Sequence, residues 1–584
     1  MFNRAGYKTM RTCKKGNSLT KKMNTIVVNG RTTKDTKQAN DTGYWDDLAW
    51  MTVHDYLTNS IQKMKKQTQL LLSIVLTIGF CFYGNTSIAA TKTISNLKIT
   101  NTLTVASPFT DHMVLQQNMK VPVWGTASPN LLITVVFENQ KKEATADNDG
   151  KWNLYLDPLT ASFTPEKMTI SAVNEEISIE DILVGEVWIC SGQSNMQMGI
   201  DGIPDIQALR PMASKIRSFT VKRTVAFEPQ DRCEGEWVTE HPNSAVAFSF
   251  AYFLRKSVNV PVGIILTAWG SSSLEAWMPR DMIETVPHFK TMMNEFDADF
   301  EIKNRIQTIL EGPKPWSGPD DVFLRRQSNI LYNAMIHPLI PFACRGLVWY
   351  QGERNTQSMY GMLKEPWYSR NSGMLIYGDV LNEWIKRYRK EWNTNDFQFM
   401  IVMLPGFGQN LDSGENINPE SPAAHSWAWM RDSQLKALTS PNTSVVNTID
   451  LGDVKNIHPK DKLPIGKRLA LFATKNNFDK SIKANGPSMK RIKTKKNTII
   501  VHFNDADGLK TVNGKTPTSF WLADSSGKWF PAEAKIKGNT ILLKHTQVKK
   551  PLYVRYAFVG KPDVNLVNGA NLPAYPFRTD RLKP

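Results

Sequence analysis

The sequence has few cysteines, and they are not spaced as in metal sites. Five occur in 584 residues, and only Cys190, Cys233 and Cys344 lie beyond residue 90. There is no CxxC pair and no Cys/His spacing typical of zinc, so we expect no metal. Three cysteines allow at most one disulfide within a chain. Cys190 lies in an apolar run, and we expect it to be a small buried hydrophobic residue, not a reactive thiol.

The sequence also lacks a clear membrane span. Its apolar segment Leu70–Tyr83 is shorter than the roughly 20 residues that a transmembrane helix requires. Lysines precede this segment and small residues follow it, which predicts a signal peptide over residues 64–90. Residues 1–63 are then a non-native or disordered extension. A cleaved signal peptide leaves no stable membrane span and predicts a secreted or periplasmic protein, whereas a retained signal anchor is the alternative.

No dense basic stripe accompanies the positive charge of the chain. The formal net charge is +17, of which +8 lies in residues 1–90. The remaining excess is small for so long a chain, and no recognised nucleic-acid motif goes with it. A basic nucleic-acid binder is therefore the weakest interpretation, and we expect no nucleic acid among the partners.

At this length the chain requires two to four domains. Residues 91–180 contain short runs rich in Val, Ile and aromatic residues, such as Leu132–Phe137 and Lys151–Leu156, which predict an N-terminal β-sandwich. Short strand-like runs separated by turn residues return over residues 486–584, which predicts a C-terminal β-rich domain. No repeats or low-complexity segments are present.

Residues 181–485 have a different pattern, in which apolar runs alternate with helical stretches. Two of these helical stretches are Asp379–Trp392 and Lys467–Lys475. Such alternation predicts a layered α/β domain with a parallel sheet, whose ligands bind beyond the carboxyl ends of the strands. The predicted strands are Val184–Ile189, Val262–Leu266, Leu347–Tyr350, Phe399–Met403 and Ser444–Ile449.

Ser194 follows the first of these strands, in the run Gly192-Gln193-Ser194-Asn195-Met196. A serine at a strand-to-helix turn exposes its hydroxyl and leaves backbone N–H groups that can bind an oxyanion. An ordinary N-cap serine is the alternative on this run alone.

A serine hydroxyl needs a base, and His458 is the best candidate among nine histidines. It follows the last predicted strand and precedes a helix of mixed charge. His337 is a rival, but its apolar surroundings favour a role in packing. Two further loops follow strands and could bind an oxyanion: Gln351 offers amide N–H donors, and Gly270 allows close approach of the backbone.

The run Val187–Met196 resembles the nucleophile segment of sialate O-acetylesterases, within the SGNH hydrolase superfamily. Other segments resemble the same family in the same order, which makes the resemblance specific. They are Asp111–Gln116, Val123–Gly125, Glu275–Trp277, Leu331–Ile336, Gly346–Glu353, Ile457–Lys460, Val554–Tyr556, Asn565–Leu566, Leu572–Pro573 and Pro576–Asp580.

The resemblance implies an SGNH-like α/β/α fold with Ser194 as nucleophile and His458 as general base. It also implies an oxyanion hole made by the backbone N–H groups of Ser194 and Gly270 and the side chain of Gln351. The implied reaction removes O-acetyl groups from a sugar, with O-acetylated sialic acids as substrate, through an acyl-enzyme and with no cofactor. The alternatives are acetylated xylan or another glycan as substrate, and a carbohydrate-binding protein on an inactive hydrolase scaffold.

The sequence departs from the family pattern at two places. Many relatives have Asp three residues before the histidine, where this chain has Lys455. Asp453, Asp450 or a backbone carbonyl then orients His458, and Asp453 is our preferred candidate. The second departure is Ser271, where relatives often have a second glycine.

Overall fold

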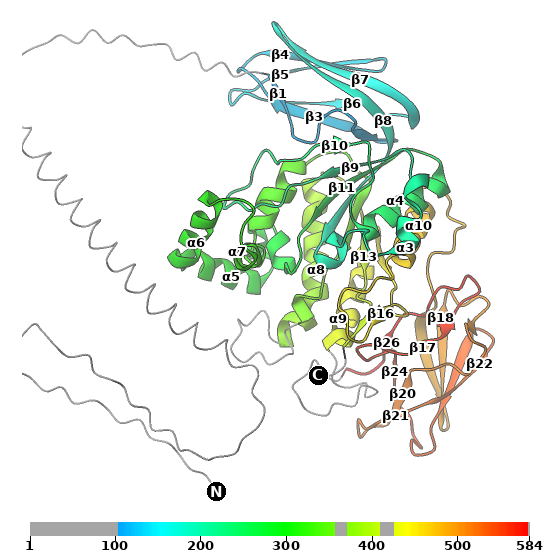
Figure 1. Ribbon diagram of the computed structural model, residues 1–584. Helices are drawn as coiled ribbons and strands as arrows, with labels where there is room; N and C mark the ends of the chain where they lie inside the picture. Colours follow the sequence, from blue (N-terminus) through cyan, green and yellow to red (C-terminus); the bar gives the residue numbers. More distant parts are fainter. Residues whose placement is uncertain (1–102, 357–370, 409–425, 582–584) are drawn as a thin grey trace, which may run out of the picture. The chain divides into compact units, whose positions relative to one another are not determined.

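The computed structural model describes residues 103–356, 371–408 and 426–581 (Figure 1). All of them belong to one structural unit, residues 98–584. The predicted extension and signal peptide lie outside the described residues. Within the described ranges, no helix has the length and apolarity needed to cross a membrane.

The centre of the fold is a sheet with the strand order β10-β9-β11-β8-β12-β13-β15. All neighbours from β9 to β15 pair in parallel, whereas β10 is antiparallel to β9. All five predicted strands are present, and their residues are almost entirely buried because both faces of the sheet are covered. The bounds are β8 Glu175–Gly192, β9 Ile216–Thr220, β10 Trp237–Val238, β11 Val262–Ala268, β12 Gly346–Tyr350, β13 Gln398–Val402 and β15 Thr443–Val446.

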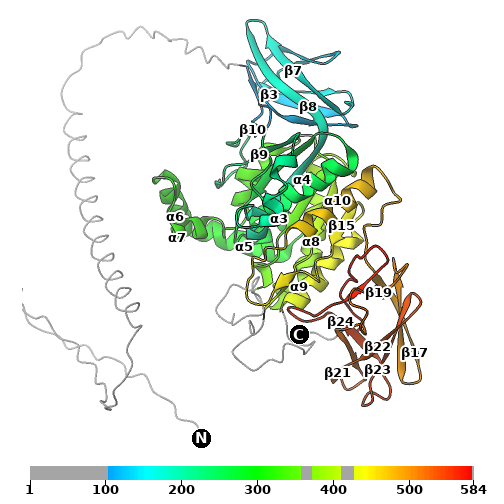
Figure 2. The ribbon, with the colours of Figure 1, turned by 45° about the vertical axis from the view of Figure 1, so that its right-hand side comes forward.

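Helices cover both faces of this sheet (Figure 2). On one face, Trp188 of β8 packs against Phe250 of helix α4 (Ala245–Val258), which in turn packs on α10 (Leu463–Asn477). Trp349 of β12 is level with Ser191 of β8 and so points to the other face. There it contacts Trp384 of α8 (Asn371–Glu391), which packs against α9 (Ser426–Leu435). The predicted three-layer α/β/α fold is confirmed.

Both predicted helices are longer than their patterns indicated. α8 begins at Asn371 and not at Asp379, and α10 begins at Leu463 because Pro464 is accommodated in its first turn. Four other helices are α3 Pro204–Gln207, α5 Pro287–Ala298, α6 Phe300–Glu311 and α7 Gly318–Leu324.

Short antiparallel strands precede the central sheet, and β8 is continuous with them. Its first half pairs with β7 and its second half with β11 and β12, so the predicted boundary between residues 180 and 181 lies inside one strand. The earlier strands are β1 Thr104–Val105, β2 Val114–Gln116, β3 Val121–Thr126, β4 Leu132–Phe137, β5 Gln140–Thr145, β6 Lys151–Leu156 and β7 Ser162–Ala172.

The C-terminal region contains two four-stranded antiparallel sheets, of order β17-β18-β23-β22 and β21-β20-β24-β26, and the pair β19-β25. Their bounds are β17 Ser488–Lys495, β18 Thr498–Asn504, β19 Lys510–Thr511, β20 Phe520–Ala523, β21 Trp529–Pro531, β22 Glu533–Lys537, β23 Thr540–Lys544, β24 Tyr553–Tyr556, β25 Leu566–Val567 and β26 Phe577–Arg578.

The register of the central strands determines where a site can form. Gly192 at the end of β8 is level with Ala268 at the end of β11 and with Tyr350 at the end of β12. The loops that follow these three strands therefore begin side by side at one edge of the sheet.

Candidate active site

Ser194 lies one residue beyond a sharp turn at the end of β8. Gly192 has φ of +137°, and a Cβ at this position would lie 2.1 Å from the carbonyl oxygen of Tyr350, so only glycine fits there. Ser194 then begins the short helix α2 (Ser194–Gln197). Its N–H belongs to the first helical residue and therefore has no acceptor one turn back. The local fold thus exposes a hydroxyl beside an available backbone donor.

His458 reaches Ser194 from a loop 264 residues further along the chain. Its Nε2 lies 2.8 Å from Ser194 Oγ, which is a normal hydrogen-bond distance. The pKa of His458 lies below its ordinary value, mainly because the ring is partly buried and also because Lys462 is positively charged. The imidazole therefore stays neutral at neutral pH, which is the state that accepts the hydroxyl proton.

Asn195, the residue after the nucleophile, fixes the loop that carries the base. Its Nδ2 donates to the carbonyl oxygen of Ile457 at 3.0 Å, immediately before His458, and to Glu353 Oε1 at 2.5 Å. Its Oδ1 accepts from Lys462 Nζ at 2.5 Å. One buried amide therefore joins the Ser194 turn to the His458 loop.

Glu353 and Lys462 are both buried on either side of this amide. Burial raises the pKa of Glu353 to about 7, against the opposing effects of the Asn195 hydrogen bond and of Lys462. Burial likewise lowers the pKa of Lys462 to about 8, against the attraction of Glu353 and Asp461. The second oxygen of Glu353, Oε2, is buried and has no hydrogen-bond partner among the described residues.

The two carboxylates considered as partners of His458 bond to other groups. Asp453, in β16 (Gly452–Asp453), accepts from the backbone N–H groups of Lys455 and Asn456 at 2.7 and 2.8 Å. Asp450 forms an ion pair with Arg468 at 2.6 Å. Within the described ranges, neither carboxylate forms a hydrogen bond with His458. Asp453 thus organises the loop before His458 through its backbone.

Gly270, for which the sequence predicts a role in the oxyanion hole, lies against Ser194. A Cβ at this position would be 3.2 Å from Ser194 Cβ. The Gly270 N–H donates to Gln197 Oε1 at 2.7 Å, so an oxygen acceptor already occupies the position in front of this donor. The next residue, Ser271, has φ of +62°. This left-handed backbone is costly for serine, which explains in physical terms why glycine suits this position.

Gln351 is fully buried beneath the site. Its Nε2 lies within hydrogen-bond distance of Gln193 Oε1 at 3.1 Å, Ser272 O at 3.0 Å and Asn355 Oδ1 at 2.8 Å. Its Oε1 accepts from the hydroxyl of Tyr377 at 2.7 Å. The amide has two hydrogens for these three acceptors, so it connects the three loops at the sheet edge to one another.

A cavity of about 490 Å³ contains Ser194, Gly270 and His458 in its lining, and Gln351 is not among the residues that line it. The other lining residues are Gln193, Gln197, Met198, Gly199, Ser271, Arg325, Glu353, Arg354 and Ile457.

The sequence alone did not predict a role for Asn195, Glu353 or Lys462. Asn195 and Glu353 lie in segments that resemble the family. Their roles nevertheless depend on contacts between residues more than 150 positions apart in the chain, which a local sequence pattern does not contain.

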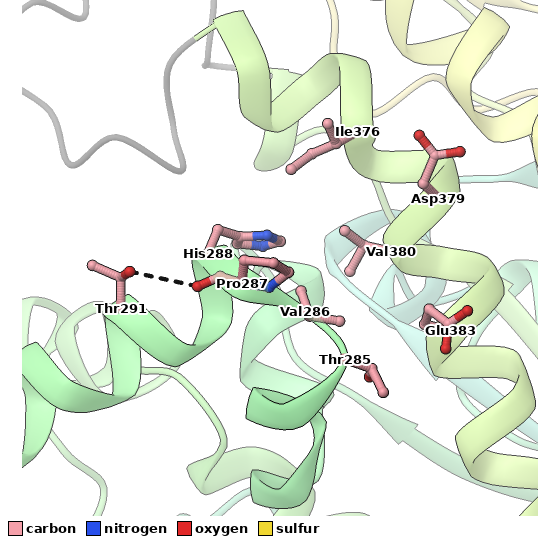
Figure 3. Close-up of a pocket in the computed structure, with 9 residues that line it drawn as sticks. All are labelled: Thr285, Val286, Pro287, His288, Thr291, Ile376, Asp379, Val380 and Glu383. Atoms are coloured by element: carbon pink, nitrogen blue, oxygen red, sulfur yellow. Dashed lines mark hydrogen bonds between the residues drawn. The ribbon is translucent and has the colours of Figure 1, made fainter.

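Two other cavities contain histidines. His337, the rival base, lines a cavity of about 690 Å³ beside β3 and β6, and its Nδ1 lies 2.9 Å from the carbonyl oxygen of Gln230. His288 lines a cavity of about 610 Å³ between the start of α5 and α8 (Figure 3). Neither cavity contains Ser194. In the part of the chain that the structure describes, no group of three or more His, Cys, Asp or Glu side chains could hold a metal.

The described cysteines agree with the sequence prediction. Cys190, Cys233 and Cys344 are free, and Cys190 is fully buried in β8. Burial raises the pKa of its thiol far above the ordinary value, which makes it an unreactive core residue.

Comparison with known proteins finds similarity to carbohydrate esterases. Residues 184–310 match the family model of the carbohydrate esterases described as sialic acid-specific acetylesterase. A crystal structure of a carbohydrate acetylesterase from Xanthomonas citri is 30% identical, with a TM-score of 0.69, and the match covers 82% of this chain and 100% of that one. The chain belongs to the sialate O-acetylesterase family. This membership makes the protein a carbohydrate O-acetyl esterase.

Curated relatives are similar over most of their length. Mouse sialate O-acetylesterase is 26% identical over 515 residues, covering 78% of this chain and 90% of the relative. The rat protein of the same name is 26% identical, covering 73% of this chain and 84% of the relative. The matches extend well beyond the nucleophile segment, as the ordered motifs of the sequence predicted.

Proposed function

We propose that the protein is a serine esterase that removes O-acetyl groups from sialic acids through an acyl-enzyme. The observation that carries the proposal is the 2.8 Å contact between Ser194 Oγ and His458 Nε2, in a cavity at the carboxyl edge of a parallel sheet. Nucleophile, base and a neighbouring backbone donor are the parts that acyl transfer requires.

In the first half of the proposed reaction, Ser194 Oγ attacks the acetyl carbonyl carbon while His458 Nε2 takes the hydroxyl proton. The C–O bond to the sugar then breaks, and His458 returns the proton to the leaving sugar oxygen. In the second half, water attacks the acetyl-serine, gives a proton to His458, and acetate leaves as the proton returns to Ser194. The cycle needs neither a metal nor an organic cofactor.

The oxyanion hole in this proposal begins with the backbone N–H groups of Ser194 and Gly270. Gln197 Oε1 now accepts from Gly270, so the substrate oxyanion would take the place of this oxygen. Each such donor contributes about 3 to 4 kcal/mol to transition-state stabilisation in comparable hydrolases. The role of Gln351 stays a prediction, and its amide reaches an oxyanion only by giving up a bond to Gln193, Ser272 or Asn355.

The predicted Asp453 enters the proposal indirectly. It holds the backbone of the loop before His458, while Asn195 holds the carbonyl of Ile457. We therefore propose a catalytic pair, Ser194 and His458, whose geometry is maintained through the loop backbone.

The proposed domains are residues 91–180, 181–485 and 486–584, of which the first two share strand β8, with the flanking β-regions bracing the catalytic layer. Export, and hence a secreted or periplasmic location, rests on the pattern of residues 64–90. N-terminal sequencing of the exported protein tests both residues 1–63 and the signal peptide. A mature chain that starts near Ala90 or Thr91 supports cleavage, and a chain that retains residues 64–90 contradicts it.

The decisive experiment measures acetate release from O-acetylated sialic acids and from acetylated xylan, with the wild type and Ser194→Ala. We expect the sialic acid ester to be the better substrate and the variant to be inactive while its circular dichroism spectrum is unchanged. A fluorophosphonate should label the wild type only. A wild type that binds glycan but is neither labelled nor active would show an inactive scaffold, and an active Ser194→Ala variant would contradict the mechanism.

A further inference from the structure

More basic than acidic side chains line the catalytic cavity. Two arginines, Arg325 and Arg354, line it together with one acidic residue, Glu353. Glu353 is 4% exposed, already bonds to Asn195, and its pKa is raised to about 7 by burial. The partly exposed charged side chains that line this cavity are therefore both arginines, although the hydrolysis of an acetyl ester itself does not require an arginine.

An ion pair with Asp321 fixes the position of Arg325. It follows the last residue of α7, and its Nη1 lies 2.8 Å from the carboxylate of Asp321, one turn earlier. Asp321 also accepts from Trp269 Nε1 at 3.2 Å, and Trp269 immediately precedes Gly270. The guanidinium is thus fixed relative to the predicted oxyanion hole.

The Nε of the Arg325 guanidinium is buried and has no hydrogen-bond partner among the residues that the structure describes. A guanidinium is planar and presents donors along two edges, so pairing one edge with Asp321 leaves donors for a second carboxylate. Its charge persists at any physiological pH.

Arg354 comes from the loop after β12, next to Glu353. Its backbone N–H donates to Gln193 Oε1 at 3.1 Å, and Gln193 immediately precedes the nucleophile. This bond fixes the backbone of Arg354 beside the Ser194 turn. Two cationic side chains from separate loops are thereby brought to the cavity that contains Ser194 and His458.

We infer that Arg325 and Arg354 form a carboxylate subsite, so that the enzyme selects O-acetyl esters of acidic sugars over those of neutral sugars. The inference rests on the proposed function, because the anionic group is on the same molecule as the acetyl ester. A sugar carboxylate is ionised at neutral pH and is recognised by guanidinium groups through charge-assisted hydrogen bonds. A neutral acetylated sugar offers no such partner.

The test changes the charge of the substrate and of the enzyme together. Acetate release is measured with O-acetylated N-acetylneuraminic acid and with its methyl ester, which keeps the acetyl group but removes the charge. The enzymes are the wild type, Arg325→Gln, Arg354→Gln and Arg325→Lys. The readout is the ratio of kcat/KM for the acid to kcat/KM for the methyl ester. Arg305→Gln is the matched control, because it removes an ion pair with Asp320 of the same helix α7 and does not line the cavity.

We expect the wild type to favour the acid and each Arg→Gln variant to lower the ratio by about 10-fold or more, mainly through KM. Arg325→Lys should restore part of the ratio, and Arg305→Gln should leave it as in the wild type. A wild type without preference for the acid, or variants with the wild-type ratio, would overturn the inference. The proposed function fails separately, if Ser194→Ala still hydrolyses either ester.

Discussion

His458 and His288 each bond through Nε2 to a side-chain oxygen, at 2.8 Å from Ser194 Oγ and 3.1 Å from Glu275 Oε1. His458 is partly exposed in the cavity, whereas the side chains of His288 and Glu275 are 4% and 5% exposed. Glu275 also accepts from Asn355 Nδ2, and Asn355 Oδ1 accepts from Gln351, so His288 belongs to a chain of hydrogen-bonded buried groups. A histidine with a polar partner is therefore a candidate base only where both a nucleophile and space for a substrate adjoin it.

The protonation states also differ. Desolvation by burial opposes the negative charge of Glu275, but His288 and Asn355 outweigh it, so the pKa of this carboxyl lies below its ordinary value. The Glu275 carboxylate therefore stays ionised and paired. His458 instead has a lowered pKa and a neutral partner, so its surroundings keep it ready to accept a proton.

The largest expected effect is the loss of activity on replacing His458. His458→Ala removes the proposed base, so kcat for acetyl ester hydrolysis should fall by about 10³-fold or more. Its thermal unfolding should change little, because the side chain is partly exposed. His337→Ala is the matched control, since that histidine lines another cavity. A His458→Ala variant within tenfold of the wild type would mean that another group acts as the base.

The next effect should be on stability. Glu275→Ala leaves His288 and Asn355 without their buried acceptor, which should lower the free energy of unfolding by about 3 kcal/mol. Urea unfolding followed by tryptophan fluorescence measures this loss. The exposed carboxylate Glu284 offers a control, because removing it should cost almost nothing. Equal stability of the Glu275 and Glu284 variants would show that the buried network is not what holds these loops.

A smaller loss of activity is expected at Asn195. In Asn195→Ala the bonds to Ile457, Glu353 and Lys462 disappear, so the Ser194 turn and the His458 loop are no longer tied together. We expect kcat to fall by about 10- to 100-fold with a small change in KM, because misplacement of reacting groups affects the chemical step. Asn195→Asp, which keeps the size but loses the donors, should be impaired to a similar degree. A change in KM alone would place Asn195 in substrate binding.

The sequence predicts which loops meet at the site, but not the hydrogen bonds between them. The proximity of Ser194 and His458 could be predicted because each follows a buried strand of a parallel sheet, and such strands end at one edge. The contacts that hold the His458 loop in place could not be predicted, because hydrogen bonds such as that from Asn195 to Ile457 join residues 262 positions apart in the chain. The change of sequence pattern predicts a domain boundary between residues 180 and 181, but β8 passes through this point as one strand.

Asp453 provides a test with a still smaller expected effect. If its carboxylate oriented the imidazole directly, Asp453→Asn would lower kcat by about 10⁴-fold, as for the aspartate of a serine protease triad. Since it accepts from the N–H groups of Lys455 and Asn456, an asparagine oxygen can replace it. We therefore expect a loss of about threefold or less in kcat, and a loss greater than 100-fold would restore Asp453 as the direct partner.

The smallest effect concerns pH and tests why His458 differs from an ordinary histidine. The base must be neutral, so kcat/KM should fall on acidification through a midpoint below 6.5, the ordinary pKa, because burial and then Lys462 lower the pKa of His458. Lys462→Met removes the second cause, so the midpoint should move upward toward 6.5, by less than about one pH unit. Lys460→Met, at an exposed position of the same loop, is the control. The measurement is the pH profile of kcat/KM with a neutral acetyl ester. A midpoint that stays in place or moves downward in Lys462→Met would show that burial alone sets the pKa of His458.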